Sequence, residues 1–197
     1  MARHKVFISY HHSARAGWNE KSDSDYRDEL ENLLSQQFGV IVSKSVQDGD
    51  ISEYSSAENT HRIIREKYLS DSTVTVVLIG NDTWGRKHVD WELSSSLRKT
   101  RTNSRSGVIG IILPTFRHKE NYSFSNYGKI KLENSSSYVD ENYILERLSM
   151  NIDNGFVKLY EWEGSPYTIE RWIDEAFDRR DKINPDNSLE MFKRNKS

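Results

Sequence analysis

Hydrophobic residues gather in short runs along the chain, and each run is rich in β-branched or aromatic side chains. The runs are KVFISY at 5–10, TVTVVLIG at 73–80, GVIGIILP at 107–114 and GFVKLYEW at 155–162, with a weaker fifth, GVIV, at 39–42. The second and third of these runs are almost continuously apolar, which is typical of strands covered on both faces. The pattern predicts a parallel sheet of five strands with helices on each side.

Between these runs, apolar residues recur at the spacing of a helix. The predicted helices rest on Tyr26, Leu30, Leu33, Leu34 and Phe38, on Ile63, Ile64, Tyr68 and Leu69, on Val89, Leu93 and Leu97, and on Ile169, Trp172, Ile173, Ala176 and Phe177. Strand and helix therefore alternate from residue 5 to about residue 114, as in right-handed βαβ crossovers. We expect an open, doubly wound α/β sheet.

After residue 114 the periodic pattern weakens. Residues 115–143 are polar and aromatic without a clear period, so we interpret them as a long loop that is either functional or an insertion. The tail from residue 184 is polar and is expected to be frayed. We therefore predict one domain over residues 1–183, with the insertion at about 115–143, and a C-terminal tail at 184–197.

Composition limits the partners and the compartment. The net charge is −2, from 28 basic and 30 acidic residues, which does not indicate a nucleic-acid surface. The absence of cysteine excludes thiolate zinc sites and disulfides. No apolar stretch is long enough for a signal peptide or a membrane span, so we expect a cytoplasmic protein without a membrane partner. A basic cluster comprises Arg86, Lys87, Arg98, Lys99, Arg101 and Arg105, and it is either a solvated face or the neighbour of an anionic ligand.

The familiar catalytic and metal-binding motifs are missing. The sequence contains no GxGxxG, Walker A, GxSxG or HExxH motif. Asp48 and Asp50 resemble the start of a calcium loop, but Glu53 stands at its glycine position and Asn59 at its bidentate glutamate position. The six histidines show no metal spacing. We expect no bound metal.

Three polar segments are expected to meet beyond the carboxyl ends of the strands, where open α/β sheets bind ligands. They are residues 9–25, 43–56 and 80–92. Glu92 belongs to the third, in the first turns of a helix, about 60° around that helix from the buried Val89. Two interpretations stay open: an acid that complements the helix dipole, or a catalytic carboxylate. Trp91 lies on nearly the opposite face, so we expect it to cover another segment or an interface.

The order of four motifs resembles a TIR domain. They are VFISYHHS at 6–13, DGD at 48–50, VTVVLIGNDTW at 74–84 and VDWEL at 89–93. More narrowly, the chain is similar to the bacterial TIR-like family that includes the NAD-processing subunits of Thoeris antiphage systems. The resemblance covers residues 5 to about 113, and it implies a flavodoxin-like fold of three layers. The loop after the second strand departs from receptor TIR domains, because SVQDGDI replaces their Arg-Asp pair and proline.

The resemblance also implies which residues act. The catalytic glutamate of the family's W-E-L segment matches Glu92, and Ser9, Tyr10 and His11 match the nucleotide pocket. The remaining substrate-binding candidates are Thr83 and Trp84 on the pocket wall, Asp48 in the second loop, and Arg86, which would meet the pyrophosphate.

The expected function is cleavage of NAD, with NAD as the substrate and no further cofactor. Because nicotinamide departs neutral from a cationic linkage, a single carboxylate suffices, whereas ordinary glycosidases need two. The product would be ADP-ribose or a cyclic ADP-ribose signal for an effector in antiphage defence, made after a phage trigger and assembly into homo-oligomers. One alternative is a non-enzymatic TIR-like assembly module that binds through Trp91 or the 115–143 insertion. Another is an enzyme like nucleoside deoxyribosyltransferases, which also uses a glutamate at a glycosidic carbon.

Overall fold

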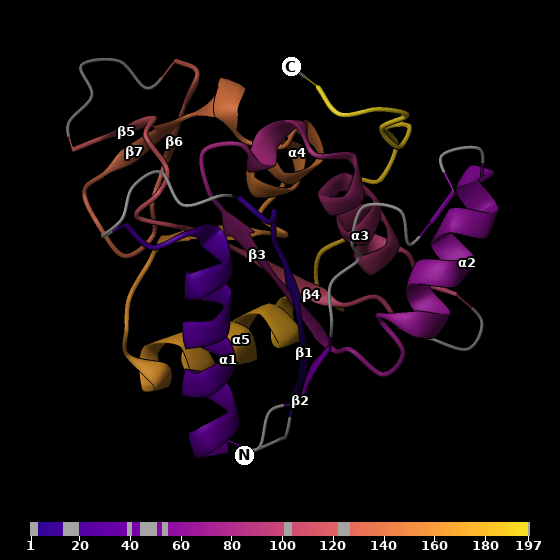
Figure 1. Cartoon of the computed structure of the whole chain (residues 1–197), viewed down its shortest axis with the longest axis horizontal. Coiled ribbons are helices and arrows are strands. Elements are labelled where there is room, and N and C mark those ends of the chain that lie inside the picture. Colours follow the sequence, from indigo (N-terminus) through magenta and orange to yellow (C-terminus); the bar gives the residue numbers. More distant parts are fainter. Residues whose placement is uncertain are drawn as a thin grey trace.

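A central parallel sheet organises the fold. The computed structural model of the chain describes residues 4–13, 20–38, 41–43, 51–52, 55–100, 104–121 and 127–196. Five strands pair in the order β2-β1-β3-β4-β8 (Figure 1). They are β1 (Lys5–Ser9), β2 (Ile41–Ser43), β3 (Val74–Ile79), β4 (Gly107–Ile112) and β8 (Lys158–Glu161). The predicted α/β fold with an open, parallel, five-stranded sheet is confirmed.

The central strands are apolar throughout because helices cover both of their faces. All six residues of β3 are buried, and successive side chains point to opposite faces. Val76 and Leu78 pack in one core cluster, whereas Val77 and Ile79 pack in a second cluster on the other face. Each cluster therefore supplies one of the two layers of packing that hold the sheet between helices.

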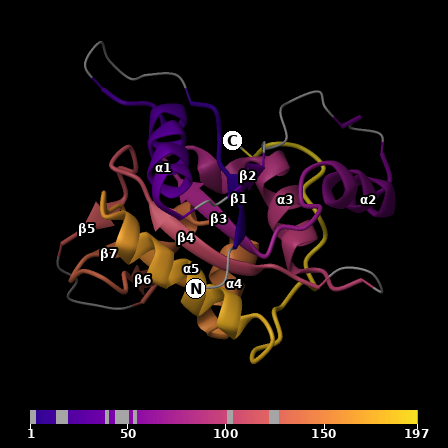
Figure 2. The ribbon, with the colours of Figure 1, turned by 90° about the horizontal axis from the view of Figure 1, so that it is seen from below.

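Five helices form the outer layers (Figure 2). On one face, α1 (Asp23–Phe38) and α5 (Pro166–Arg179) pack against β1, β3 and β4. On the other face lie α2 (Ala57–Lys67), α3 (Lys87–Leu97) and α4 (Glu146–Asp153). Four of these helices match the predicted apolar groups. No helix in the described part of the chain has both the length and the apolar character needed to cross a membrane.

The insertion carries structure that its sequence did not predict. Short strands β5 (Lys119–Glu120), β6 (Lys129–Lys131) and β7 (Tyr138–Asp140) form an antiparallel sheet in the order β5-β7-β6. Its Ile130 and Val139 are buried in the same core cluster as α3 and α4, which attaches the small sheet to the main body. The interpretation of this region as a loop was therefore wrong. Its strands were missed because two or three residues are too few to show a hydrophobic period.

Helix α4 was also missed, although its sequence contains the signal. Leu145, Leu148 and Ile152 are spaced i, i+3 and i+7, and all three pack in the core cluster of α3. This helix completes the crossover between β4 and β8. It also places Arg147, whose side chain is fully buried, beside α3.

The expectation of a frayed tail is wrong. We use the name C-terminal segment for residues 184–196, which run along α3 and α4 (Figures 1 and 2). The amide of Asn151 donates to the Asp186 carbonyl at 2.7 Å, and the Asp186 N–H donates back to the Asn151 side-chain oxygen at 2.8 Å. The segment is held by side-chain to backbone hydrogen bonds, which leave no periodic pattern in a sequence.

Candidate functional site

The carboxylate of Glu92 lies beneath the carboxyl end of β1. Its side chain has 0% exposure, and the Ser9 hydroxyl donates a hydrogen bond of 2.5 Å to its Oε2. Ser9 is the last residue of β1 and pairs with Val77, so Gly80 lies three residues, about 10 Å, further along β3 toward the sheet edge. Glu92 is therefore an interior carboxylate of the sheet–helix interface. The first-turn acid of α3 is Asp90, so the dipole interpretation suits Asp90 rather than Glu92.

The ring of His88 on α3 lies close to the ring of His11, which follows β1. His88 precedes Glu92 by four residues on α3, so both side chains share one helix face. The ring centroids of His88 and His11 are 5.7 Å apart. His11 follows Ser9 by two residues, and its contact with His88 brings it to α3. His88 was not among the residues predicted from the sequence, although its i, i+4 spacing from Glu92 is a signal that indicates it.

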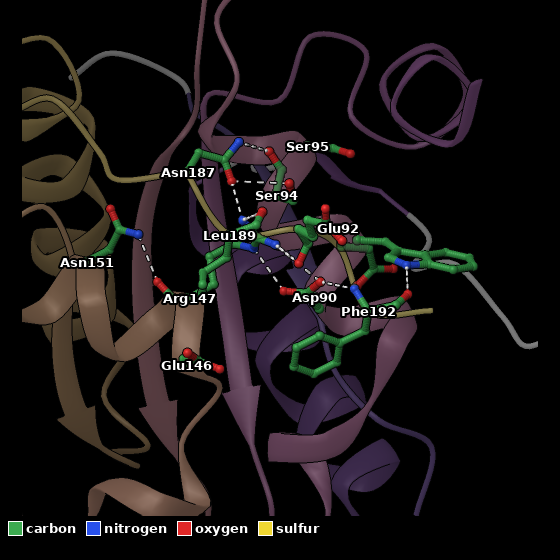
Figure 3. Close-up of polar contacts among 12 residues, drawn as sticks. Asp90, Glu92, Ser94, Ser95, Glu146, Arg147, Asn151, Asn187, Leu189 and Phe192 are labelled. Carbon is green, nitrogen blue, oxygen red and sulfur yellow. Dashed lines mark hydrogen bonds and ion pairs between the residues drawn. The ribbon is translucent and has the colours of Figure 1, made fainter. Parts of the chain in front are cut away.

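Three consecutive serines connect α3 to three different elements. Because residues of a helix are offset by about 100°, Ser94, Ser95 and Ser96 point in different directions. Ser94 bonds Asn187 of the C-terminal segment at 3.2 Å, as Figure 3 shows. The Ser95 hydroxyl lies 2.9 Å from Nδ1 of His61 on α2. The Ser96 hydroxyl lies 2.8 Å from the hydroxyl of Thr75 on β3. These links fix the rotation of the helix that carries Glu92.

Tyr10 lies on the other side of the sheet from Glu92. Its side chain is buried in the core cluster of α1 and α5, and its hydroxyl lies 3.2 Å from His12 Nδ1. The alternation of side chains along the strand explains this placement, because Ser9 faces α3 and the next residue must face α1. The structure thus brings Ser9 and His11 toward α3 and does not place Tyr10 with them.

The candidates after β3 lie in a short 3-10 turn, η1 (Thr83–Gly85). The Thr83 hydroxyl is buried and accepts a hydrogen bond from the Gly80 N–H at 3.0 Å, so it shapes the turn. Trp84 lines a cavity of about 300 Å³ beside α4. Arg86 Nε donates to the Asp82 carbonyl at 3.1 Å. None of the three contacts Glu92 through a hydrogen bond in the described part of the chain, and Asp48 lies outside the described residues.

Most of the basic cluster is occupied by partners within the chain. Lys87 is buried with its Nζ 5.6 Å from the Trp91 ring, Arg98 pairs with Glu58 at 2.8 Å, and Arg105 bonds Asn184 at 3.1 Å. Arg101 lies outside the described residues. The described residues include no cluster of three or more histidines, aspartates or glutamates arranged to hold a metal ion.

Trp91 covers another part of the chain, as expected. Its Nε1 donates to the Phe192 carbonyl at 2.7 Å, and its ring is buried with Phe7 and Ile64. The Trp91 side chain is therefore buried by contacts within the chain. The non-enzymatic alternative, in which Trp91 binds an external partner, loses that contact.

A cavity of about 750 Å³ opens at the edge of the sheet, between α1 and the ends of β3 and β4. Its lining includes Ser13, Asp23 and Thr115, and Glu92 is not among the described residues that line it. Asp23 is 1% exposed, and its Oδ1 accepts a 2.6 Å hydrogen bond from the Thr115 hydroxyl. Its Oδ2 lies against Gly80, where a Cβ would stand 2.0 Å away, so a side chain at position 80 would displace the Asp23 carboxylate.

The pH dependence of stability is expected to change in the variant Asp23→Asn. Burial raises the pKa of Asp23 above its ordinary value of 3.8, more than the hydrogen bonds with Thr115 and Ser13 lower it. Since the folded state holds this proton more tightly than the unfolded state, ionisation weakens folding as the pH rises above about 4. Urea denaturation at pH 4 and pH 7 should show that wild type loses stability relative to the variant. An equal difference at both pH values would contradict the assignment.

The chain is similar in sequence to known proteins. A sequence model described as "Thoeris protein ThsB, TIR-like domain" matches residues 7–118, which contain the end of β1, all of β3 and α3, and Glu92. The chain is also similar to a protein of Bacillus cereus (strain MSX-D12) named "Putative cyclic ADP-D-ribose synthase ThsB1". The two are 29% identical over 195 residues, covering 95% of this chain and 85% of the relative. Because the family match spans more than half of the chain, the protein belongs to the ThsB family of TIR-like domains.

Proposed function

We propose that this protein cleaves the glycosidic bond of NAD and that Glu92 is the catalytic carboxylate. One observation carries the proposal: a fully buried glutamate on α3 is hydrogen-bonded to the terminal serine of β1, beneath the end of the sheet at which α/β folds bind ligands. A carboxylate held out of water interacts more strongly with a developing positive charge than an exposed one would.

The chemistry needs only one such group. In NAD the bond between the nicotinamide nitrogen and the ribose C1′ carries a positive charge, so cleavage leaves neutral nicotinamide and an oxocarbenium-like ribosyl cation. Glu92 would stabilise that cation, and Ser9 would hold the carboxylate in position. Attack by water at C1′ forms ADP-ribose and releases one proton. Attack by an adenine nitrogen or a ribose hydroxyl of the same molecule forms a cyclic product.

The family relationship favours the cyclic product as the first one to test. The Bacillus cereus relative is named for synthesis of cyclic ADP-D-ribose, and it aligns with nearly the whole chain. A cyclic nucleotide of this kind would act as a messenger for an effector protein. We therefore propose a signalling role in antiphage defence.

The present conformation is closed. Glu92 has no exposed surface, and His88, four residues before it on α3, packs against the ring of His11. NAD reaches the carboxylate only after the residues that cover it move apart. We propose that a phage trigger, with assembly of several copies, produces this opening.

Mass spectrometry of NAD incubated with lysates of phage-infected cells tests the function and identifies the product. Cells that express the wild-type protein should release nicotinamide and accumulate ADP-ribose or a cyclic isomer, and cells that express Glu92→Gln should not. Uninfected cells serve as the control for the trigger. Intact NAD in every infected sample would contradict the proposal, and exchange of bases on deoxynucleosides would instead identify the deoxyribosyltransferase-like alternative.

A further inference from the structure

Helix α3 is unusual because all eleven of its residues are buried. Val89 and Leu93 pack on the sheet, as their spacing predicts. The opposite face carries Asp90 and Ser94, which a sequence pattern would place in water. The C-terminal segment covers this polar face, as Figure 3 shows for Asp90, Ser94, Asn187 and Phe192.

The contacts follow α3 along its length. The Asn187 amide donates to the Ser94 carbonyl at 3.0 Å, and the Phe192 N–H donates to Asp90 Oδ2 at 2.9 Å. Trp91 adds its bond to the Phe192 carbonyl. The C-terminal segment therefore runs antiparallel to α3 and is hydrogen-bonded to successive turns of the helix.

The beginning of α3 is capped by the same segment. Arg86, at the N-cap position, makes no side-chain cap bond. The Lys87 N–H instead donates to Asn195 Oδ1 at 2.9 Å, across 108 positions of sequence. Just before the helix, the Lys196 N–H donates to the Gly85 carbonyl at 2.8 Å, and a Cβ on Gly85 would meet the Lys196 carbonyl oxygen at 2.8 Å. The cap that the local sequence lacks is thus supplied by the C-terminal segment.

The C-terminal end of α3 is also held by a residue of another helix. Arg65 of α2 donates to the Ser95 carbonyl at 2.7 Å and to the Ser104 carbonyl at 3.0 Å. An isolated helix of eleven residues is marginal in water, and three serines lower its propensity further. The helix that carries Glu92 therefore depends for its position on residues outside it.

We infer that the C-terminal segment is a clamp on α3 and that Asn195 and Trp91 are positioning residues for Glu92. The inference rests on the proposed function, since it assigns these residues to the same reaction. Glu92 is adjacent to Trp91 and two residues from Asp90, so a shift of the helix moves the carboxylate by the same amount. Misplacement of a catalytic group by about 1 Å can slow a reaction by about 100-fold.

Three full-length variants and a matched control test the clamp. Asn195→Ala removes the distant cap, Trp91→Phe removes the N–H that reaches Phe192 together with part of the buried indole ring, and the double variant makes both changes. The control is Arg194→Ala, because this exposed neighbour has no hydrogen bond to α3 among the described residues. Deletion of residues 191–197 is a stronger variant, whose folding is checked by circular dichroism.

Hydrogen exchange followed by mass spectrometry measures how readily the amides of α3 open, and it does not require an active enzyme. Loss of a helix cap corresponds to about 1 kcal/mol, so amides of α3 should exchange about fivefold faster in Asn195→Ala. Amides of α5, on the other face of the sheet, should keep their wild-type rates, as should all amides of Arg194→Ala. Unchanged exchange in α3, or equal acceleration in α5, would overturn the clamp.

The rate of nicotinamide release then separates positioning from stability alone. Under the conditions in which wild type is active, Asn195→Ala and Trp91→Phe should each lower kcat several-fold with KM unchanged, and the double variant should lower it further. Faster exchange in α3 with an unchanged kcat would overturn the positioning role. Intact NAD with both wild type and variants would count against the proposed function, while the exchange rates would still decide whether α3 is clamped.

Discussion

Replacing Glu92 with glutamine is expected to reduce nicotinamide release from NAD by at least about 100- to 1,000-fold, the range measured when one electrostatic stabiliser is removed from an active site. Glutamine has nearly the same volume, and its side-chain oxygen can still accept the hydrogen bond from Ser9. The variant should therefore be slow in the chemical step, because the amide has no negative charge to stabilise the ribosyl cation. Release of nicotinamide, measured by chromatography, gives the rate.

The folded state of this variant needs its own measurement. Its circular dichroism spectrum and melting temperature should remain near those of wild type, which separates a chemical defect from unfolding. Glu66→Gln is the matched control, because Glu66 is an exposed glutamate on α2 with a surface partner, Arg62. This control should retain full activity. Equal nicotinamide release by wild type and Glu92→Gln would remove Glu92 from the mechanism.

Replacing Arg147 with methionine is expected to lower the free energy of unfolding by about 3–5 kcal/mol, the usual effect of removing one partner from a buried ion pair. Arg147 and Asp90 have side chains with 0% and 1% exposure, and the Nε–Oδ1 distance is 2.8 Å. The five N–H groups of the guanidinium all have acceptors, on Asp90, Asn187, Leu189 and Glu190. Methionine would leave Asp90 buried with an unpaired charge.

Two further variants test this explanation. The double variant Asp90→Asn/Arg147→Met removes the uncompensated charge, so it should be more stable than Arg147→Met alone. Arg62→Met breaks an exposed pair with Glu66 and should change stability by less than about 1 kcal/mol. Urea denaturation measures all three variants. A loss for Arg147→Met as small as that for Arg62→Met would contradict the stabilising role of the buried pair.

The sequence predicts those strands and helices in which burial makes apolar residues recur at a regular spacing. The runs of β3 and β4 are apolar because both faces are covered, and the same logic placed Val89 and Leu93 on the sheet. The order of motifs made Glu92 the candidate catalytic residue, and the structure places it in the interior on α3.

Polar contacts between distant segments were not predictable in this way. Asp90 and Ser94 look like a solvated face, and nothing local to them indicates that residues 184–196 will cover it. The side of the sheet that Tyr10 occupies follows from simple alternation, but the family pattern grouped it with Ser9 and His11. Short strands such as β5 give no usable period, whereas α4 had a clear one that the length of the insertion obscured.

The distant cap on α3 also determines when the candidate site is completed during synthesis. Lys87 is made 108 residues before Asn195, and elongation at about 5–20 residues per second separates them by roughly 5–20 s. Through that interval the nascent chain already contains Glu92, Ser9 and both histidines, yet α3 lacks the partner for its first turn. The proposed NAD-cleaving centre therefore gains the cap of its helix only after residue 195 has been synthesised.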